Sequence, residues 1–293
     1  ELYQADETQW AALADVLEAA KALNADAQLE GLETVQFQGR EYIPLAEAAQ
    51  RLGLEWGEAP DGLRYLARRQ TVGQIPEGWN VPVLMYHAVG DDCWGEESLF
   101  VKPEELEKQL QYLSENGYET IFFEDLSHIE QYEKPVLLTF DDGYDDNAET
   151  LLPLLQKYGM KATIFLIAGD VGKPHKLTRA QLTELVQSGL VSIQSHGWSH
   201  RNMAALSPLA LLWELVRSQS AIFTLTGRFP VALSYPNGNS SARTRKIASW
   251  FYTYGVRTCA GVYETGSDPL LIERITVSRD TTLDEFKREL EIP

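Results

Sequence analysis

The sequence predicts an α/β fold, a mainly parallel sheet covered by helices, with a small α+β domain in front of it. Eight apolar runs of strand length recur between residues 81 and 278, and helical patterns separate most of them. A segment rich in Gly and Pro divides these runs from the first 72 residues. Alternating strands and helices are typical of a parallel sheet, either closed as a barrel or open and doubly wound.

Residues 1–72 are expected to form the small α+β domain. The first apolar stripe has helical spacing, so a leading amphipathic helix is expected; its members are Trp10, Leu13, Leu17 and Ala20. A strand, a Gly turn, a helix over about 45–52 and a hairpin turning at 60–62 should follow.

Residues 73–80 are expected to be a linker, because Gly and Pro interrupt any periodicity there. The larger domain then spans 81–293. Its apolar runs are VPVLMYH, YETIFF, PVLLTF, KATIFLI, VSIQSH, VALSYP, GVRTCAGV and RITVS. Pro103 and Ser207 are typical of helix starts, and Gly159 of a helix end. In both candidate architectures the chemistry belongs at the C-terminal ends of the strands.

Composition excludes several classes of protein. The formal net charge of −18 opposes a sequence-independent grip on nucleic acid. No apolar stretch is long enough for a transmembrane segment. Cys93 and Cys259 are too few for a disulfide framework or a Cys-rich zinc site. Because residue 1 is Glu, we expect that a leader has been removed and that the protein is extracellular or at the cell surface.

Two adjacent carboxylates follow the run PVLLTF. Asp141 and Asp142 stand at the predicted strand end, and Gly143 permits a sharp turn after them. Such a pair can face a pocket there. The alternative is ordinary turn chemistry, which also favours Asp and Gly. Asp145 and Asp146 are expected to cap the next helix.

Two histidines follow the run VSIQS. If the chain turns helical there, the four-residue spacing of His196 and His200 puts both imidazoles on one face, as a divalent cation requires. The alternative is a structural role. Two His and one carboxylate leave open coordination positions, which is typical of a catalytic site, and a second carboxylate can then act as base.

TFDDGY and SHGWSH together resemble the first two motifs of the polysaccharide deacetylase family, the NodB-like carbohydrate esterases of family 4. The resemblance covers essentially all of 79–293 and implies a distorted (β/α) barrel of about seven strands. It also implies that Asp141 is the catalytic base and that Asp142, His196 and His200 hold a divalent metal. Zn²⁺ is expected, and Co²⁺ or Ni²⁺ also suits these ligands.

The family's later histidine, a general acid, has no counterpart after His200. VPVLMYHAV instead resembles the opening motif of the circularly permuted branch, which includes poly-N-acetylglucosamine deacetylases. In that branch the acid-bearing strand comes first, so His87 is the expected general acid, the alternative being a structural histidine.

The segment LSYPNG stands where the family has Arg-Pro-Pro-Tyr-Gly. The resemblance implies that Tyr235, Pro236 and Asn237 form the substrate and oxyanion loop, with the backbone N–H of Asn237 as the donor. Ser234 replaces the family arginine that orients the base.

Arg274 in ERITVS is the expected substitute for that arginine, and an ion pair with Glu273 is an equal alternative. The family also places a Trp beside an Asp in the pocket wall, and this pair is missing. Trp94 and Trp198 are the candidate sugar platforms, and ordinary packing is the alternative for both.

GREYIPLAEAAQRLGLEW resembles the small domain named for the N-terminal region of copper amine oxidases. No His or Cys precedes His87, so copper is not expected there. A scaffold role, or attachment to the cell wall or surface, is expected instead.

Taken together, these features imply a metal-dependent hydrolase that removes N-acetyl groups from an N-acetylglucosamine-containing polysaccharide, either an exopolysaccharide or a cell-wall glycan, and releases acetate. Two alternatives stay open. One is an O-deacetylase of the acetyl xylan esterase type. The other is a carbohydrate-binding protein that has lost catalysis, which the missing motif arginine would explain.

Overall fold

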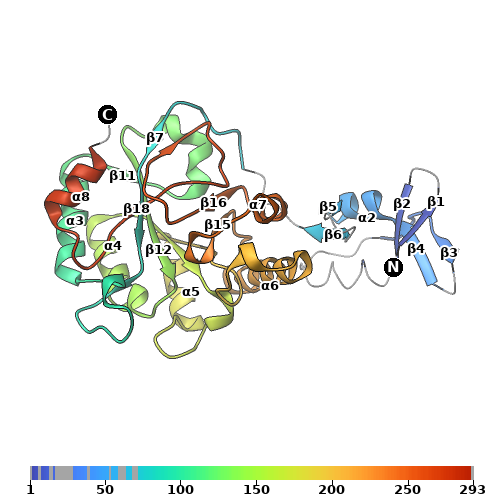
Figure 1. Cartoon of the computed structure of the whole chain (residues 1–293), viewed down its shortest axis with the longest axis horizontal. Coiled ribbons are helices and arrows are strands. Elements are labelled where there is room, and N and C mark those ends of the chain that lie inside the picture. The colour runs from blue at the N-terminus through green and yellow to red at the C-terminus, as the bar shows by residue number, and fades with distance from the viewer. Residues whose placement is uncertain are drawn as a thin grey trace.

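The computed structural model describes residues 2–5, 8–12, 16, 29–37, 40–52, 54–58, 64–67 and 72–291. Figure 1 shows a large α/β unit and, beside it, the smaller elements formed by the first 67 residues.

The large unit is built on one curled sheet, in which all the paired strands are parallel. In sheet order the strands are β16 (Tyr254–Val256), β15 (Ala232–Ser234), β14 (Val191–Ser195), β13 (Ala162–Leu166), β12 (Pro135–Asp142), β8 (Val83–Tyr86) and β18 (Ile275–Thr276), with β11 (Glu119–Thr120) beside β12. This seven-strand path is the distorted (β/α) barrel that the sequence predicts.

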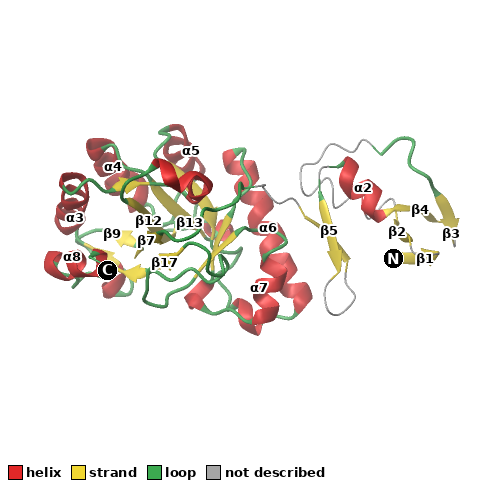
Figure 2. Ribbon diagram, turned by 90° about the horizontal axis from the view of Figure 1, so that it is seen from above, coloured by secondary structure: helices red, strands yellow, loops and turns green. Residues whose placement is uncertain are grey.

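Helices surround this sheet (Figure 2). They are α3 (Pro103–Glu115), α4 (Leu152–Tyr158), α5 (Arg179–Gln187), α6 (Pro208–Thr226), α7 (Ala242–Ala248) and α8 (Leu283–Leu290). The other helical segments are η1 (Glu97–Leu99), η2 (Phe123–Gln131), η3 (Asn147–Leu151), η4 (Ala168–Asp170), η5 (Met203–Ala205) and η6 (Pro236–Gly238).

The predicted helix boundaries are confirmed where the sequence marks them. Pro103 is the first residue of α3. The hydroxyl of Ser207 accepts a hydrogen bond from the N–H of Ala210 and caps α6. Gly159 ends α4 with a φ of 65°. Asp146 directly precedes η3, but its side chain makes no capping hydrogen bond.

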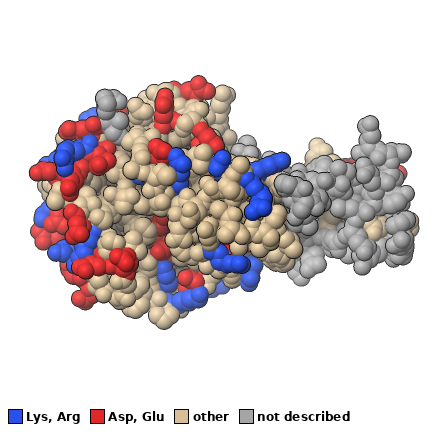
Figure 3. Space-filling model, in the orientation of Figure 1, with Lys and Arg blue, Asp and Glu red and all other residues tan. Residues whose placement is uncertain are grey.

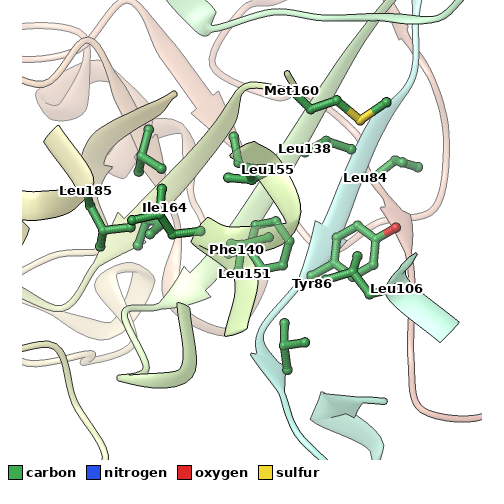
Figure 4. Close-up of a cluster of buried hydrophobic side chains, with 14 of the residues drawn as sticks. Leu84, Tyr86, Leu106, Leu138, Phe140, Leu151, Leu155, Met160, Ile164 and Leu185 are labelled. Atoms are coloured by element: carbon green, nitrogen blue, oxygen red, sulfur yellow. The ribbon is translucent and has the colours of Figure 1, made fainter. Parts of the chain in front are cut away.

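Strand β12 lies in the middle of the sheet, and all eight of its residues are buried. One face packs against α3, α4 and α5 in the cluster drawn in Figure 4, where the rings of Tyr86 and Phe140 stack with centroids 4.9 Å apart. A parallel sheet covered on both faces needs such continuous apolar strands. This buried packing fixes where the last two residues of β12, Asp141 and Asp142, stand.

Two short strand pairs flank the main sheet. β7 (Asn80–Val81) pairs antiparallel with β17 (Tyr263–Glu264), and β9 (Ala88–Val89) pairs in parallel with β10 (Phe100–Val101). The predicted linker therefore ends in a strand at Asn80.

The N-terminal elements have a buried cluster of their own, around Ile43, Leu45 and Leu52. They comprise β1 (Leu2–Ala5), β2 (Thr8–Ala12), β3 (Val35–Phe37), β4 (Arg40–Pro44), α2 (Leu45–Arg51), β5 (Glu55–Glu58) and β6 (Arg64–Ala67). The predicted helix near Leu45 is confirmed. The predicted hairpin is β5 paired with β6, and its turn lies outside the described residues.

The predicted leading helix is wrong over Thr8–Ala12. These residues form β2, which pairs antiparallel with both β1 and β4. Trp10 therefore belongs to a strand, because two ladders of backbone hydrogen bonds override a local helical spacing. Leu13, Leu17 and Ala20 lie outside the described residues.

Acidic and basic side chains alternate in small groups on the face of the large unit in Figure 3, without a continuous basic band. Among the residues that the structure describes, no helix combines the length and the apolar character needed to cross a membrane.

Candidate metal and catalytic site

Most of the polar residues that the sequence predicts for the site stand at one end of the sheet. Asp141 and Asp142 end β12, His196 follows β14, and Ser234 ends β15. His87 follows β8, which pairs with β12. Parallel strands finish at the same edge, so residues far apart in the sequence meet there.

Asp142, His196 and His200 lie together in the structure. Oδ1 of Asp142 is 3.4 Å from Nε2 of His196 and 3.7 Å from Nε2 of His200. One ligand atom from each of the three residues lies within 4.8 Å of the others. The sequence spacing of the two histidines is thus realised as a cluster, although a loop and not a helix carries them.

The donor set fits a divalent cation. Oδ1 of Asp142 is buried and accepts no hydrogen bond. Leaving a carboxylate oxygen buried without a partner is costly, and a cation would remove that cost. Two imidazoles and one carboxylate, with open positions between them, are typical ligands of catalytic zinc.

His196 is oriented by a hydrogen bond to the main chain. Its Nδ1 lies 2.8 Å from the carbonyl oxygen of Ser234. A neutral imidazole donates from Nδ1 in this position and leaves the lone pair of Nε2 facing Asp142. Burial lowers the pKa of His196, but the charges of Asp141 and Asp142 more than offset this, so its pKa lies above the usual value.

Asp141 is held by Arg274 in a bidentate ion pair. The two terminal nitrogens of Arg274 lie 2.8 Å from Oδ1 and 2.7 Å from Oδ2 of Asp141. Arg274 is fully buried, and its Nε donates to the carbonyl oxygen of Arg257. Its alternative partner, Glu273, pairs with Arg257 instead. Arg274 thus holds the predicted base in a fixed orientation.

The environment of Asp141 keeps its carboxyl ionised. Burial raises its pKa, but the charge of Arg274 and its hydrogen bonds outweigh burial and bring the pKa to about 2. Ser234, which stands where the family has arginine, donates from its hydroxyl to Oδ2 of Asp141 at 3.0 Å. Arg274 also donates to Ser234 Oγ at 3.1 Å, which closes the network.

Several of the predicted site residues have strained backbone conformations. Among the described residues, the non-glycine residues with positive φ are Asp142 (76°), His175 (59°), His200 (54°) and Asn237 (56°). Such conformations cost roughly 1–3 kcal/mol each and persist where the surrounding structure enforces them, commonly at functional sites. Three of these four residues are predicted site residues.

His87 lies within electrostatic reach of the carboxylate pair. Burial lowers its pKa, the charges of Asp141 and Asp142 raise it, and the net pKa is below the usual value. The carbonyl oxygen of His87 accepts a hydrogen bond from Nδ2 of Asn147 at 3.2 Å. The first strand of the barrel therefore brings a titratable group beside the cluster.

The chain is similar to known proteins in both sequence and fold. A family model described as Polysaccharide deacetylase matches residues 128–254. YxkH of Bacillus subtilis (strain 168), which carries the name of a polysaccharide deacetylase, is 36% identical over 204 residues, or 68% of this chain and 71% of YxkH. This chain belongs to the polysaccharide deacetylase family.

A solved structure and a second relative extend the comparison. The crystal structure of BC0361, a polysaccharide deacetylase from Bacillus cereus, matches with a TM-score of 0.70 and 28% identity over 81% of this chain and 76% of that one. The poly-β-1,6-N-acetyl-D-glucosamine N-deacetylase of Escherichia coli (strain K12) is 28% identical over 173 residues. That match covers 52% of this chain and 25% of the relative.

In this polysaccharide deacetylase the LSYPNG segment forms a tight turn. Tyr235 and Pro236 are buried, and the ring of Tyr235 packs in a hydrophobic cluster against α6 and α7. Their side chains therefore shape the loop, and the role of this segment in binding substrate and the oxyanion stays a prediction. Asn237 is exposed at the tip of the turn.

The two candidate platforms differ in their surroundings. Trp94 is 43% exposed, and its ring stacks on His175 with centroids 4.2 Å apart. It also meets the edge of Tyr144, whose hydroxyl donates to Oδ2 of Asp142 at 2.8 Å. Trp198 instead packs against the core and under the guanidinium of Arg217. Trp94 is thus the exposed aromatic face beside the metal-ligand cluster.

Sequence reasoning missed two residues that support Asp142. Tyr144 donates to its carboxylate, and Lys176 donates to its carbonyl oxygen at 3.2 Å. The ammonium of Lys176 also lies 3.6 Å from the ring centroid of Tyr144. The spacing of Tyr144, two residues after Asp142, was a usable signal. Lys176 comes from a distant loop and offered none.

Proposed function

We propose that this family member is a metal-dependent N-deacetylase that acts on N-acetylglucosamine-containing polysaccharide and releases acetate. The observation that carries the proposal is the difference in environment between the two adjacent carboxylates, Asp141 and Asp142. Asp141 is oriented by a bidentate ion pair with Arg274, whereas Oδ1 of Asp142 accepts no hydrogen bond and faces two imidazoles. One carboxylate is built as a base and the other as a ligand.

In this proposal Asp142, His196 and His200 hold the cation. When bound, a divalent cation supplies Lewis-acid polarisation of the acetyl carbonyl and lowers the pKa of water toward about 7. Zn²⁺ is the expected metal, with Co²⁺ and Ni²⁺ as substitutes.

Asp141 accepts the proton of the attacking water. Arg274 donates to both carboxylate oxygens and Ser234 donates a second hydrogen bond to Oδ2, which fixes the plane of the carboxylate. One lone pair of Oδ1 is therefore available for the water. The backbone N–H of Asn237, presented by a left-handed turn, is the proposed donor to the oxyanion. One such donor is typically worth about 2.7–4 kcal/mol.

His87 is the proposed general acid. Cleavage of the C–N bond leaves an amine, which needs a proton as the bond breaks. His87 stands beside the carboxylates but follows a different strand, β8, so the base and the acid can approach the substrate from two sides. An ester leaving group depends much less on such a proton.

The ion pair of Arg274 with Asp141 argues against the alternative of a carbohydrate-binding protein that has lost catalysis. The motif arginine is missing from the sequence segment where the family has it, but the guanidinium of Arg274, directly before β18, binds the predicted base. The alternative of a carbohydrate-binding protein depends on the absence of that arginine, and Arg274 takes its place at Asp141.

We further propose that residues 1–72 are an accessory domain, 73–80 the linker and 81–293 the catalytic domain. The separate buried cluster of the N-terminal elements supports this division. We propose an extracellular or surface location, because the proposed substrates, exopolysaccharide and wall glycan, occur there. Attachment to the wall or surface is the proposed role of the accessory domain.

Acetate release tests the proposal. Zn²⁺-loaded and chelated protein would be compared on β-1,4- and β-1,6-linked N-acetylglucosamine oligomers, peptidoglycan fragments and acetylated xylan. We expect release from the N-acetylated substrates by the loaded protein only. Preference for acetylated xylan, retained in His87→Ala, would establish an O-deacetylase instead. Sugar binding without any release would establish a binding protein.

A further inference from the structure

The loop between the two histidine ligands is bound by a single buried carboxylate. Oε2 of Glu214 accepts hydrogen bonds from the backbone N–H groups of Trp198, at 3.1 Å, and Ser199, at 2.9 Å. Oε1 accepts from the hydroxyl of Ser199 at 2.5 Å. Glu214 is 7% exposed. Its two oxygens thus satisfy three donors of a loop that spans three residues between His196 and His200.

Glu214 belongs to one face of α6 that follows the loop from end to end. Ser218, four residues later on the helix, bonds through its hydroxyl to that of Ser195, directly before His196. The guanidinium of Arg217 lies 4.2 Å from the ring centroid of Trp198. Positions i, i+3 and i+4 share a helix face, so this face of α6 holds the segment Ser195–Ser199.

The loop needs such support because its backbone is strained. Gly197 has a φ of 78°, and a Cβ there would lie 2.8 Å from Cε of Met203. His200 has a φ of 54°, in a region that a residue with a side chain adopts at a cost. The two N–H groups that point at Glu214 would lose their acceptor if it were removed.

We propose that Glu214 is a positioning residue for the metal, which sets the separation of His196 and His200 by fixing the backbone between them. This inference rests on the proposed metal-dependent function. Partners one step removed from metal ligands typically contribute about 10- to 100-fold in metal affinity. The carboxylate acts on the ligand geometry and touches neither the cation nor the substrate.

Two substitutions of Glu214 distinguish the effect of its hydrogen bonds from the effect of its negative charge. In Glu214→Leu the three hydrogen bonds are lost, and the Zn²⁺ dissociation constant should rise about 10- to 100-fold. In Glu214→Gln the amide oxygen can accept from both N–H groups while the amide nitrogen donates to Ser199 Oγ. Glu214→Gln should therefore stay within a few fold of the wild type.

A matched control lies on the same helix. Gln219 is fully buried and donates to the carbonyl oxygen of Phe251 at 3.0 Å, away from the histidine loop. Gln219→Leu should lower the melting temperature of the metal-free protein without changing Zn²⁺ affinity. Ser199→Ala removes one of the three bonds at an exposed position and should raise the dissociation constant by a smaller factor.

The measurement is the Zn²⁺ dissociation constant of each full-length variant, obtained by competition with a chromophoric chelator, alongside the metal-free melting temperature. The inference holds if affinity falls in the order wild type, Ser199→Ala, Glu214→Leu, while Glu214→Gln and Gln219→Leu stay near the wild type. It is overturned if Glu214→Leu and Ser199→Ala bind as tightly as the wild type, or if Gln219→Leu weakens binding equally. A wild type that binds no Zn²⁺ would overturn the metal proposal and this inference with it.

Discussion

Arg274 is the residue whose role depends most on the three-dimensional structure. It follows Asp141 by 133 residues, and the sequence offered Glu273 as an equally good partner. Burial decides between Asp141 and Glu273 as the partner of Arg274. A fully buried guanidinium needs an anionic partner that binds it directly, and Asp141 is buried beside it. The local motifs DDGY and HGWSH could be interpreted from the sequence alone. The contact of Arg274 with Asp141 could be predicted only as one of two alternatives, and those of Lys176 and Glu214 could not be predicted.

Arg274→Lys should lower kcat at least tenfold with little change in KM. Lysine keeps the charge but cannot form the two parallel hydrogen bonds that orient the base. Bound metal should be unchanged, since Arg274 touches Asp141 and not the ligand cluster. Steady-state kinetics and metal content check this. Arg257→Lys, in the part-exposed neighbouring ion pair, is the control, and equal losses in both variants would contradict the specific role.

Trp94→Ala should raise KM for oligomers of several sugars and leave kcat for a short substrate nearly unchanged. The exposed ring stands beside the ligand cluster but bonds to none of its members, so it can bind sugar faces without taking part in the chemistry. Kinetics as a function of oligomer length check this. Trp198→Phe serves as the packed comparison, and an effect of Trp94→Ala that does not depend on length would be contrary to a platform role.

At the scale of elements, the sequence predicted the strands well because buried parallel strands are continuous apolar runs. β12 illustrates this, since each of its residues is buried. The prediction failed at Thr8–Ala12, where pairing with β1 and β4 overrides helical spacing. It was incomplete at Asp146, which precedes η3 as expected but is half-buried there and does not cap it.

Asp146 provides a prediction about pH and stability. Burial raises the pKa of its carboxyl from 3.8 to about 7. Folding therefore favours the protonated form, so this group's contribution to the free energy of unfolding falls as the pH rises from about 4 to about 7. Asp146→Asn removes the cost of burying the charge. Its stability relative to the wild type should be greater at pH 8 than at pH 4.5.

Urea unfolding of the metal-free proteins at the two pH values measures this difference. Asp284→Asn, on the exposed side of α8, controls for the loss of one negative charge. A stability difference for Asp146→Asn that is the same at both pH values would contradict the raised pKa.

At the scale of the molecule, the chain is arranged around one curled sheet whose C-terminal edge carries the site. The N-terminal elements contribute none of the site residues named above and have their own buried cluster. Removal of residues 1–72 should therefore leave kcat and KM for soluble oligomers within about twofold. A loss of binding to intact walls or surface polysaccharide, with activity on oligomers retained, is the expected consequence. Loss of activity on the oligomers as well would show that the proposed domain boundary is wrong.

The central claim is that Asp141 is the base and Asp142 a metal ligand. The most direct test measures Zn²⁺ content and acetate release from N-acetylglucosamine oligomers for Asp141→Asn and Asp142→Asn side by side. We predict that Asp141→Asn keeps its metal and loses acetate release by a factor of about 10² or more, whereas Asp142→Asn loses the metal itself. Loss of metal on Asp141→Asn with retention on Asp142→Asn would contradict the account.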